Sequence, residues 1–350
     1  MPSLANKKIA VTGAGGFLGR AVVRVLVAEG ATVTALLRSG HDADAMRALG
    51  AIPVQAPLVA GPALQAAMRD HDVLVHLAYD VRADAAANLA AFDAVYGAAQ
   101  GAGVGHFVHA SSVVVYDDWP SDTVLTEESS IGRVPAHGYR AAKIEMARRL
   151  MEGPLPATVL EPTIIWGPGS EIWTEGPMHQ LRHGGMVLPK PCGRAPLLFV
   201  DDAARAFALA AALEEPGHDR FLVTGPETPS WEALFQGYAA IVGGTLLREP
   251  LQTLRDALPP ASNGPSKPGM AARVSQALRA ILGRKRFKSL MSAASRLRPP
   301  GGPARPDRFR LTLFATSPVI DIARAKSRLR FAPRIGLAPG LDQIRKQSSQ

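Results

Sequence analysis

The 350-residue chain has a single cysteine, Cys192, and no long run of apolar residues. One cysteine cannot form an internal disulfide, so a fold built on a disulfide framework is excluded. A membrane-spanning helix needs about 20 consecutive apolar residues, and no segment approaches that length. The N-terminal residues lead directly into a short apolar strand, without the apolar core of a secretory signal peptide. These absences predict a soluble, cytoplasmic protein.

Aromatic residues make up only 6% of the chain, and its positive charge lies mostly near the end. The net charge is +9, yet residues 251–350 hold 20 Lys and Arg against 4 Asp and Glu, so the first 250 residues are net negative. A basic excess can indicate nucleic-acid binding. No aromatic platform for base stacking accompanies this one, so we expect no nucleic-acid partner.

The basic residues concentrate in an insert at about 268–298. Apolar residues recur there at helical spacing, with Arg284, Lys285 and Arg286 among the interleaved cations. Three interpretations remain open: a solvated helical face, a lid whose arginines meet a phosphorylated or acidic substrate, and weak contact with an anionic membrane surface.

The first half of the chain alternates short apolar strands with helical stretches. The expected strands lie at 8–12, 32–37, 72–77, 106–110 and 155–160, and a helix is expected at 20–29. This alternation is typical of an α/β fold with a doubly wound parallel sheet. We expect that domain at residues 1–165, completed by about 200–228. A smaller, mostly helical substrate-binding region then comprises 166–199 and 229–350.

A glycine-rich loop lies between the first expected strand and the following helix. Gly13 permits a tight turn, Gly16 lets the backbone approach a pyrophosphate, and Gly19 lets helix and strand pack closely. The helix N-terminus offers free N–H groups and a partial positive charge to phosphates. In this context the loop predicts a Rossmann fold that binds a dinucleotide.

Arg38 is the only charged residue at the tip of the second expected strand. A carboxylate there would bind the ribose hydroxyls of NAD, whereas an arginine meets the 2′-phosphate of NADP. We therefore expect NADP(H) as the favoured cofactor, with NAD(H) as the alternative, and no metal.

A tyrosine and a lysine, Tyr139 and Lys143, lie four residues apart and hence on one face of a helix. A phenol with the usual pKa near 10 is a poor acid–base catalyst at neutral pH. A nearby ammonium group favours the phenolate, so we expect Lys143, helped by an oxidised nicotinamide, to lower the pKa of Tyr139. Upstream, Ser111 and Ser112 close an apolar strand, where open parallel sheets expose ligand-binding groups.

Several motifs in order make the chain similar to the extended short-chain dehydrogenase/reductase family, also called the NAD-dependent epimerase/dehydratase superfamily. The matching segments are the TGxGGFLG loop at 12–19, the D-x-x-x-H-L-A strand at 72–78, Ser-Ser-x-x-x-Tyr at 111–116, Tyr139 with Lys143, the P-x-x-x-W-G-P-G turn at 162–169 and the V-D-D segment at 200–202. The resemblance extends along nearly the whole chain.

The resemblance implies a role for each matching residue. Ser112 would hydrogen-bond the substrate oxygen, Tyr139 would be the acid/base, and Lys143 would hold the nicotinamide ribose and tune Tyr139. Cofactor contacts would come from Gly13, Gly16, Phe17, Leu18, Gly19, Arg38, Leu77, Ala78, Tyr139, Lys143 and Pro162.

Departures from the family pattern disfavour some of the reactions that the family catalyses. Val113 and Val114 stand where 4,6-dehydratases carry an Asp-Glu pair, which disfavours dehydration. Glu161 replaces the usual arginine before Pro162. Sugar-nucleotide epimerases often carry an arginine before the V-D-D segment that binds the substrate pyrophosphate. Here Arg194 lies one residue before the position of that arginine.

We therefore expect an NADP(H)-preferring oxidoreductase, a homodimer, that transfers hydride at a ketone or secondary-alcohol carbon. Its substrate is a small carbonyl or alcohol compound, and phosphorylated compounds and nucleotide sugars remain open. The alternatives are a nucleotide-sugar 4-epimerase and a non-catalytic NADP-sensing regulator.

Overall fold

A computed structural model of the chain describes residues 4–259 and 302–348. The basic insert expected at about 268–298 lies outside these ranges. The structure therefore tests none of the three interpretations of it. None of the described helices has the length and apolar character that crossing a bilayer requires.

Seven parallel strands form the central sheet, in the order β11-β7-β5-β4-β1-β2-β3. The strands are β1 (Lys8–Thr12), β2 (Thr32–Leu37), β3 (Ile52–Gln55), β4 (Val73–His76), β5 (His106–Ala110), β6 (Val124–Leu125), β7 (Ala157–Pro162), β8 (Ile164–Trp166), β9 (Met186–Lys190), β10 (Leu197–Phe199), β11 (His218–Val223), β12 (Leu246–Pro250) and β13 (Val319–Ile320). The chain order reverses at β1, which pairs with β2 on one side and with β4 on the other. Open α/β sheets bind ligands beyond the carboxyl ends of their strands at such a switch point.

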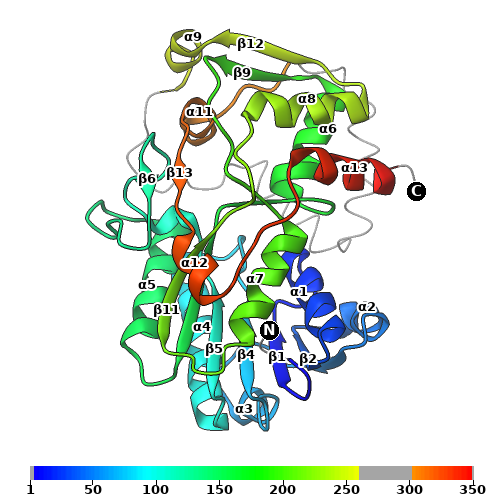
Figure 1. The fold of residues 1–350 in the computed structure, drawn as a ribbon, viewed down its shortest axis with the longest axis vertical. Helices are drawn as coiled ribbons and strands as arrows, with labels where there is room; N and C mark the ends of the chain where they lie inside the picture. The colour runs from blue at the N-terminus through cyan, green and yellow to red at the C-terminus, as the bar shows by residue number, and fades with distance from the viewer. Residues whose placement is uncertain (1–3, 260–301, 349–350) are drawn as a thin grey trace.

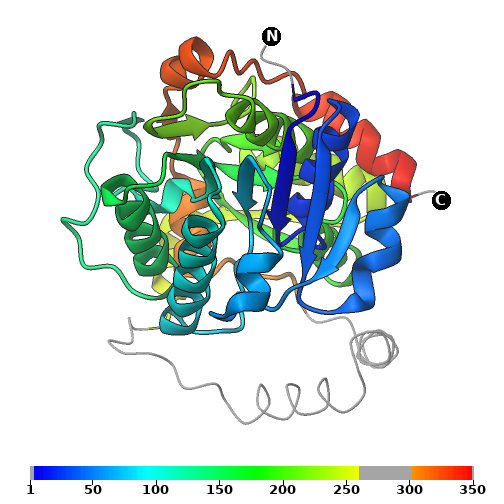
Figure 2. The ribbon, with the colours of Figure 1, turned by 90° about the horizontal axis from the view of Figure 1, so that it is seen from below.

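Helices cover both faces of this sheet (Figures 1 and 2). The described helices are α1 (Phe17–Ala28), α2 (Ala43–Ala48), α3 (Pro62–Ala66), α4 (Ala85–Ala102), α5 (Gly138–Glu152), α6 (Gly176–His183), α7 (Val200–Ala211), α8 (Trp231–Val242), α9 (Leu251–Asp256), α11 (Arg308–Ala315), α12 (Ala323–Arg328) and α13 (Leu337–Ser348). Helices α1 and α7 pack together on one face, and α3, α4 and α5 on the other.

Side chains of β1 alternate between two hydrophobic cores, because successive side chains of a strand point to opposite faces of the sheet and both faces are buried here. Ile9 and Val11 belong to the core beneath α1, whereas Ala10 belongs to the core that contains Phe92 of α4. The sequence-based expectation of a doubly wound parallel α/β fold is confirmed.

The expected element boundaries shift by a few residues. Helix α1 begins at Phe17 and not at residue 20, because Gly16 already serves as its N-cap. Strand β7 extends to Pro162, and β11 pairs with it along its whole length. β11 thus adds the edge strand of the sheet within the range 200–228.

The smaller region combines helices with short strand pairs. Helix α8 packs against α6 and α13, and β9 pairs with β12 beyond them (Figure 1). Its core is aromatic: the ring of Trp231 lies 4.7 Å from that of Phe314 and 5.6 Å from that of Trp173, between centroids. Because residues 260–301 are not described, the domain division given above stays a prediction.

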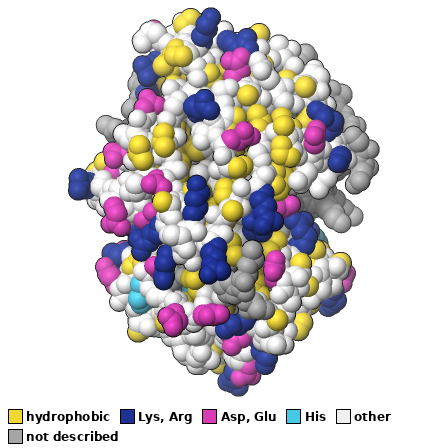
Figure 3. All heavy atoms as spheres, in the orientation of Figure 1, with side chains coloured by type: hydrophobic (Ala, Val, Ile, Leu, Met, Phe, Trp, Pro, Cys, Tyr) yellow, Lys and Arg dark blue, Asp and Glu magenta, His cyan; other side chains and the backbone are white. Residues whose placement is uncertain are grey.

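Charged side chains of both signs are interspersed over the described part of the face in Figure 3. Lys and Arg stand singly or in small groups among Asp and Glu, and they form no continuous basic stripe there.

Candidate active site and cofactor site

The glycine loop is pressed against the segment that follows β4. Gly13 has a φ of +70°, and a Cβ built on it would lie 2.8 Å from the backbone N of Ala78 and 2.9 Å from the carbonyl C of Leu77. Only glycine fits both that conformation and that space. Leu77 and Ala78 thus lie beside the loop, and their expected place along the nicotinamide and ribose stays a prediction.

The loop opens helix α1 without any side-chain cap. Gly16 is the N-cap, so the cap residue has no side chain to accept from the first N–H groups, and the first turn has no acidic residue. A Cβ on Gly19 would lie 2.1 Å from the carbonyl oxygen of Gly13, so helix and loop are in direct backbone contact. The uncapped helix end and this cradle fit the pyrophosphate of a dinucleotide.

Phe17 and Leu18, in the first turn of α1, are half-buried. A Cβ built on Gly169 would lie 3.6 Å from the ring of Phe17, so the W-G-P-G turn reaches the glycine loop. Pro162, also expected beside the cofactor, closes the buried strand β7. The structure thus brings the end of β7 and the turn after it to the same edge of the sheet.

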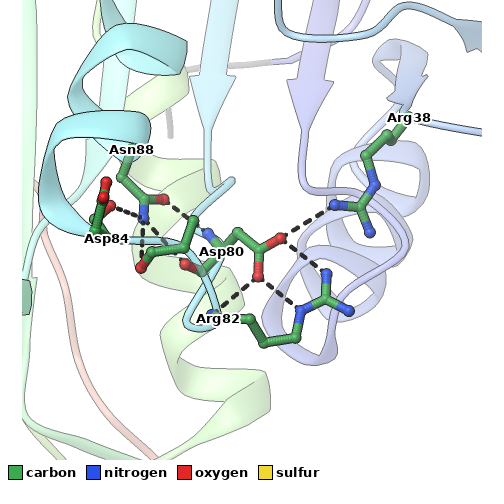
Figure 4. Close-up of polar contacts among 6 residues, drawn as sticks. Arg38, Asp80, Arg82, Asp84 and Asn88 are labelled. Atoms are coloured by element: carbon green, nitrogen blue, oxygen red, sulfur yellow. Dashed lines mark hydrogen bonds and ion pairs between the residues drawn. The ribbon is translucent and has the colours of Figure 1, made fainter. Parts of the chain in front are cut away.

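Arg38 does not extend freely into solvent at the end of β2. It forms an ion pair with Asp80, with 3.2 Å between Nη1 and Oδ2, and Arg82 binds the same carboxylate (Figure 4). The hydrogen bond from Arg82 is the largest cause of a pKa of Asp80 well below its usual range. Sequence reasoning found Arg38 but missed Asp80 and Arg82, although both directly follow the D-x-x-x-H-L-A strand.

The structure brings Ser112, Tyr139 and Lys143 together at the carboxyl edge of β5. Ser112 follows β5, and its Oγ accepts a hydrogen bond from the Val114 N–H at 3.4 Å. Tyr139 lies in the first turn of α5 and contacts the Ser112 side chain, which lowers the pKa of the phenol. Lys143, one turn further, is buried and donates from Nζ to the carbonyl oxygen of Ala110 at 2.6 Å.

Burial, and not Lys143, dominates the electrostatics of Tyr139. The residue as a whole is 41% exposed, but desolvation of its hydroxyl raises its pKa to about 12. The chain's own residues therefore do not lower this pKa, because burial of the hydroxyl outweighs the hydrogen bond with Ser112. A lowered pKa in the presence of the oxidised nicotinamide stays a prediction. At neutral pH the phenol carries its proton.

Burial also lowers the pKa of Lys143 to about 7. Between about pH 7 and about pH 10, the unfolded chain binds more protons at Lys143 than the folded chain does. The free energy of unfolding therefore rises with pH over this window. We expect the melting temperature of the wild type to rise over this window relative to that of Lys143→Met, by the equivalent of about 1–3 kcal/mol. Calorimetric melting of both proteins at several pH values measures the difference. Parallel pH profiles for the two would contradict the buried, titrating lysine.

Tyr79 joins this cluster, although the sequence patterns did not single it out. Its ring meets that of Tyr139 edge-on, with 4.8 Å between centroids, and Lys143 Nζ lies 5.0 Å from the Tyr79 centroid. Tyr79 directly follows the Leu77-Ala78 pair, and that position was the available signal. Its ring covers Lys143 from the side of the cofactor loop.

Arg140 links the turn that carries Ser112 to the helix that carries Tyr139. It donates from Nε to the Val114 carbonyl at 3.0 Å and from Nη2 to the Val115 carbonyl at 3.3 Å, and it pairs with the buried carboxylate of Asp117. Sequence reasoning missed Arg140, because nothing in a Y-x-x-x-K pattern gives a role to the residue after the tyrosine.

Glu161, which stands in place of the family's usual arginine, is fully buried beside the site. Its carboxylate accepts from the Tyr116 hydroxyl at 2.6 Å and from Arg220 Nε at 2.9 Å. Burial raises the pKa of Glu161, and the Arg220 guanidinium opposes that shift. Arg220 on the neighbouring strand β11 thus balances the charge of the buried Glu161 carboxylate.

The chain matches the model of the NAD dependent epimerase/dehydratase family over residues 9–223. It is 27% identical to a 4-hydroxy-2-methyl-3-oxo-4-farnesyl-3,4-dihydroquinoline-1-oxide ketoreductase of Stigmatella aurantiaca, over 96% of this chain and 95% of that protein. It is 28% identical to a 2-alkyl-3-oxoalkanoate reductase of Stenotrophomonas maltophilia, over 67% of this chain and 76% of that protein.

Solved structures share the fold. A UDP-N-acetylglucosamine 4-epimerase from Bacillus cereus superposes with a TM-score of 0.67 at 16% identity, over 98% of this chain and 97% of that one. A UDP-glucose 4-epimerase from Thermotoga maritima gives a TM-score of 0.66 at 18% identity, over 98% of both chains. With its family match, its doubly wound sheet and its similarity to named reductases, the chain belongs to the NAD dependent epimerase/dehydratase family and is an NAD(P)-dependent enzyme of the extended short-chain dehydrogenase/reductase type.

Proposed function

We propose that the protein reduces a ketone to a secondary alcohol, with NADPH as the favoured hydride donor. The observation that carries this proposal is the convergence of Ser112, Tyr139 and Lys143 beyond β5, beside the uncapped glycine loop. Two hydroxyl groups there can meet one carbonyl oxygen, while a buried cation lies within reach of the same cluster.

The chain's own residues supply the proton and the orientation. Ser112 and Tyr139 hydrogen-bond the substrate oxygen, and Tyr139 transfers its proton to that oxygen as negative charge develops on it. Its raised pKa suits this direction, because the phenol is protonated at neutral pH. Lys143 holds the nicotinamide ribose, and the glycine loop holds the pyrophosphate. NADPH, when bound, supplies the hydride.

The substrate we propose is a 3-oxo compound with an apolar chain. Both relatives' names describe a 3-oxo group together with an alkyl or farnesyl substituent. Exposed apolar side chains near the site support this class: Val81 follows Tyr79 by two residues, and Val134 is hydrogen-bonded through its carbonyl to Arg140.

Turnover with two substrates tests the proposal. The purified protein is given NADPH together with either a 2-alkyl-3-oxoalkanoate or UDP-glucose, and both products and cofactor are quantified. We expect one secondary alcohol for each NADPH oxidised, and no change in the sugar. Epimerised sugar without net cofactor consumption would establish the 4-epimerase instead, and no turnover of either substrate would favour a cofactor-sensing regulator.

Arg38→Asp is expected to move cofactor preference from NADP(H) toward NAD(H). A charge-assisted bond to a phosphate contributes roughly 1.5–3 kcal/mol, which corresponds to about one to two decades in affinity. The ratio of kcat/KM for NADPH to that for NADH, measured on wild type and variant, checks this. If the wild type already prefers NADH, the assignment of Arg38 to the 2′-phosphate is wrong.

A further inference from the structure

Arg82 and its contact with Asp80 are not used by the proposed reaction, although they lie beside Arg38. Arg82 Nε donates to Asp80 Oδ1 and Nη2 to Oδ2, both at 2.8 Å, while Arg38 Nη1 lies 3.2 Å from Oδ2 (Figure 4). Two guanidinium groups therefore share one carboxylate, which leaves the trio with a net positive charge.

The backbone holds this arrangement in place. The Asp80 N–H donates to Asn88 Oδ1 at 2.8 Å, and Asn88 Nδ2 donates back to the Asp80 carbonyl at 3.0 Å. The Arg82 N–H donates to Asp80 Oδ1 at 3.0 Å. Asn88 of α4 thus fixes the Asp80 backbone. The two guanidinium groups reach the Asp80 carboxylate through side chains that are 74% exposed for Arg38 and 55% for Arg82.

The two guanidinium groups have the spacing of a phosphate clamp. One nitrogen of each approaches the same Asp80 oxygen, so the two nitrogens are at most about 6 Å apart. Two charge-assisted donors that each contact a different oxygen of one phosphate at about 2.8 Å can have that separation. A phosphate monoester carries a charge near −1.5 to −2 at about pH 7, which matches two guanidinium groups better than one carboxylate does.

The position of the trio fits the adenosine end of a dinucleotide. Arg38 follows β2 and Asp80 follows β4, and these strands flank β1, from which the glycine loop emerges. The ion pair between Arg38 and Asp80 therefore spans the switch point, from the end of β2 to the end of β4, where the cofactor is expected to lie.

We propose that Arg82 is a second ligand of the NADP 2′-phosphate, and that Asp80 occupies in the cofactor-free protein the place which that phosphate takes. This inference rests on the proposed preference of Arg38 for NADP(H). On binding, both arginines exchange a carboxylate oxygen for phosphate oxygens, and the Asp80 backbone stays tied to Asn88. Arg38 and Arg82 then favour NADP over NAD by binding its 2′-phosphate, and the Asp80 carboxylate competes with that phosphate for the two arginines.

Calorimetric dissociation constants of NADP+ and NAD+ test the inference without relying on turnover. The proteins are the wild type, Arg38→Ala, Arg82→Ala and the control Arg47→Ala, which removes a similarly exposed arginine paired with Asp44 on α2. Arg82→Ala should weaken NADP+ binding about tenfold and leave NAD+ within a factor of two, and Arg47→Ala should change neither. Equal weakening of both cofactors would assign Arg82 to the shared pyrophosphate and overturn the inference, as would no change.

Asp80→Asn isolates the role of the carboxylate. Removing the competitor should tighten NADP+ binding several-fold more than NAD+ binding, whereas weaker NADP+ binding would show that Asp80 only orders the arginines and would overturn its part. Arg38→Ala separates a failure of the Arg82 assignment from a failure of the proposed NADP(H) preference. If Arg38→Ala weakens NADP+ selectively and Arg82→Ala does not, only this inference fails. If wild type binds NAD+ more tightly than NADP+, the proposed cofactor preference fails.

Discussion

Replacing Tyr139 by phenylalanine is expected to lower kcat by about two to four orders of magnitude, the usual contribution of a general acid or base. The change removes one hydroxyl from a ring that is partly exposed and packs edge-on against Tyr79. The fold and cofactor affinity should therefore persist while the proton donor is lost. Steady-state kinetics with the ketone and NADPH measures kcat, and calorimetry measures cofactor binding on the same samples.

Tyr96→Phe is a matched control for this experiment. It deletes the same atom from a half-buried tyrosine of α4 whose buried hydroxyl has no hydrogen-bond partner within the described ranges. That variant should keep the wild-type kcat. A Tyr139→Phe enzyme that turns over near the wild-type rate would show that another group supplies the proton.

Gly19→Ala should abolish measurable cofactor binding and lower the stability of the first domain. The added methyl would lie 2.1 Å from the Gly13 carbonyl oxygen and 2.8 Å from the Ala14 Cα, both backbone atoms that cannot swing aside. Overpacking typically costs about 1–3 kcal/mol, and a clash with fixed backbone atoms places this variant at the upper end of that range. Because the clash involves the loop expected to hold the pyrophosphate, the loop geometry is lost along with stability. Thermal melting and NADP+ titration measure the two effects.

Gly97→Ala provides the matched control within helix α4. Within the described residues, a Cβ built on Gly97 meets no atom within 4 Å apart from the nearby backbone of its own helix. Alanine there should leave binding intact and raise stability by about 0.5–1 kcal/mol. If Gly19→Ala bound NADP+ as tightly as the wild type does, the cofactor would not lie in the glycine loop.

The parts of the molecule that follow from local periodicity could be predicted from the sequence. Strands such as Thr32–Leu37 and His106–Ala110 occur at the expected bounds, since apolar runs of that length bury on both faces of a parallel sheet. Tyr139 and Lys143 share a helical face because a helix places residues four apart on one side. Gly13 and Gly19 lie where their lack of a side chain is needed.

Contacts between residues distant in sequence could not be predicted this way. Asp80 meets Arg38 across 42 positions, and Arg140 meets Asp117 across 23, so no periodic pattern relates them. The pKa of Tyr139 depends on how deeply its hydroxyl is buried, which a spacing rule does not contain. Glu161 pairs with Arg220 across 59 positions, so its burial as a paired carboxylate could not be predicted from the strand that carries it.

Transfer of an isotopic label from cofactor to product tests the central claim most directly. NADPH that carries deuterium on the transferred position of nicotinamide C4 is incubated with the protein and a 2-alkyl-3-oxoalkanoate, and the alcohol is analysed by mass spectrometry and NMR. The account predicts one deuterium on the carbinol carbon of each product molecule, with NADP+ formed in equal amount. An alcohol without deuterium, or a sugar epimer formed while the labelled cofactor persists, would contradict it.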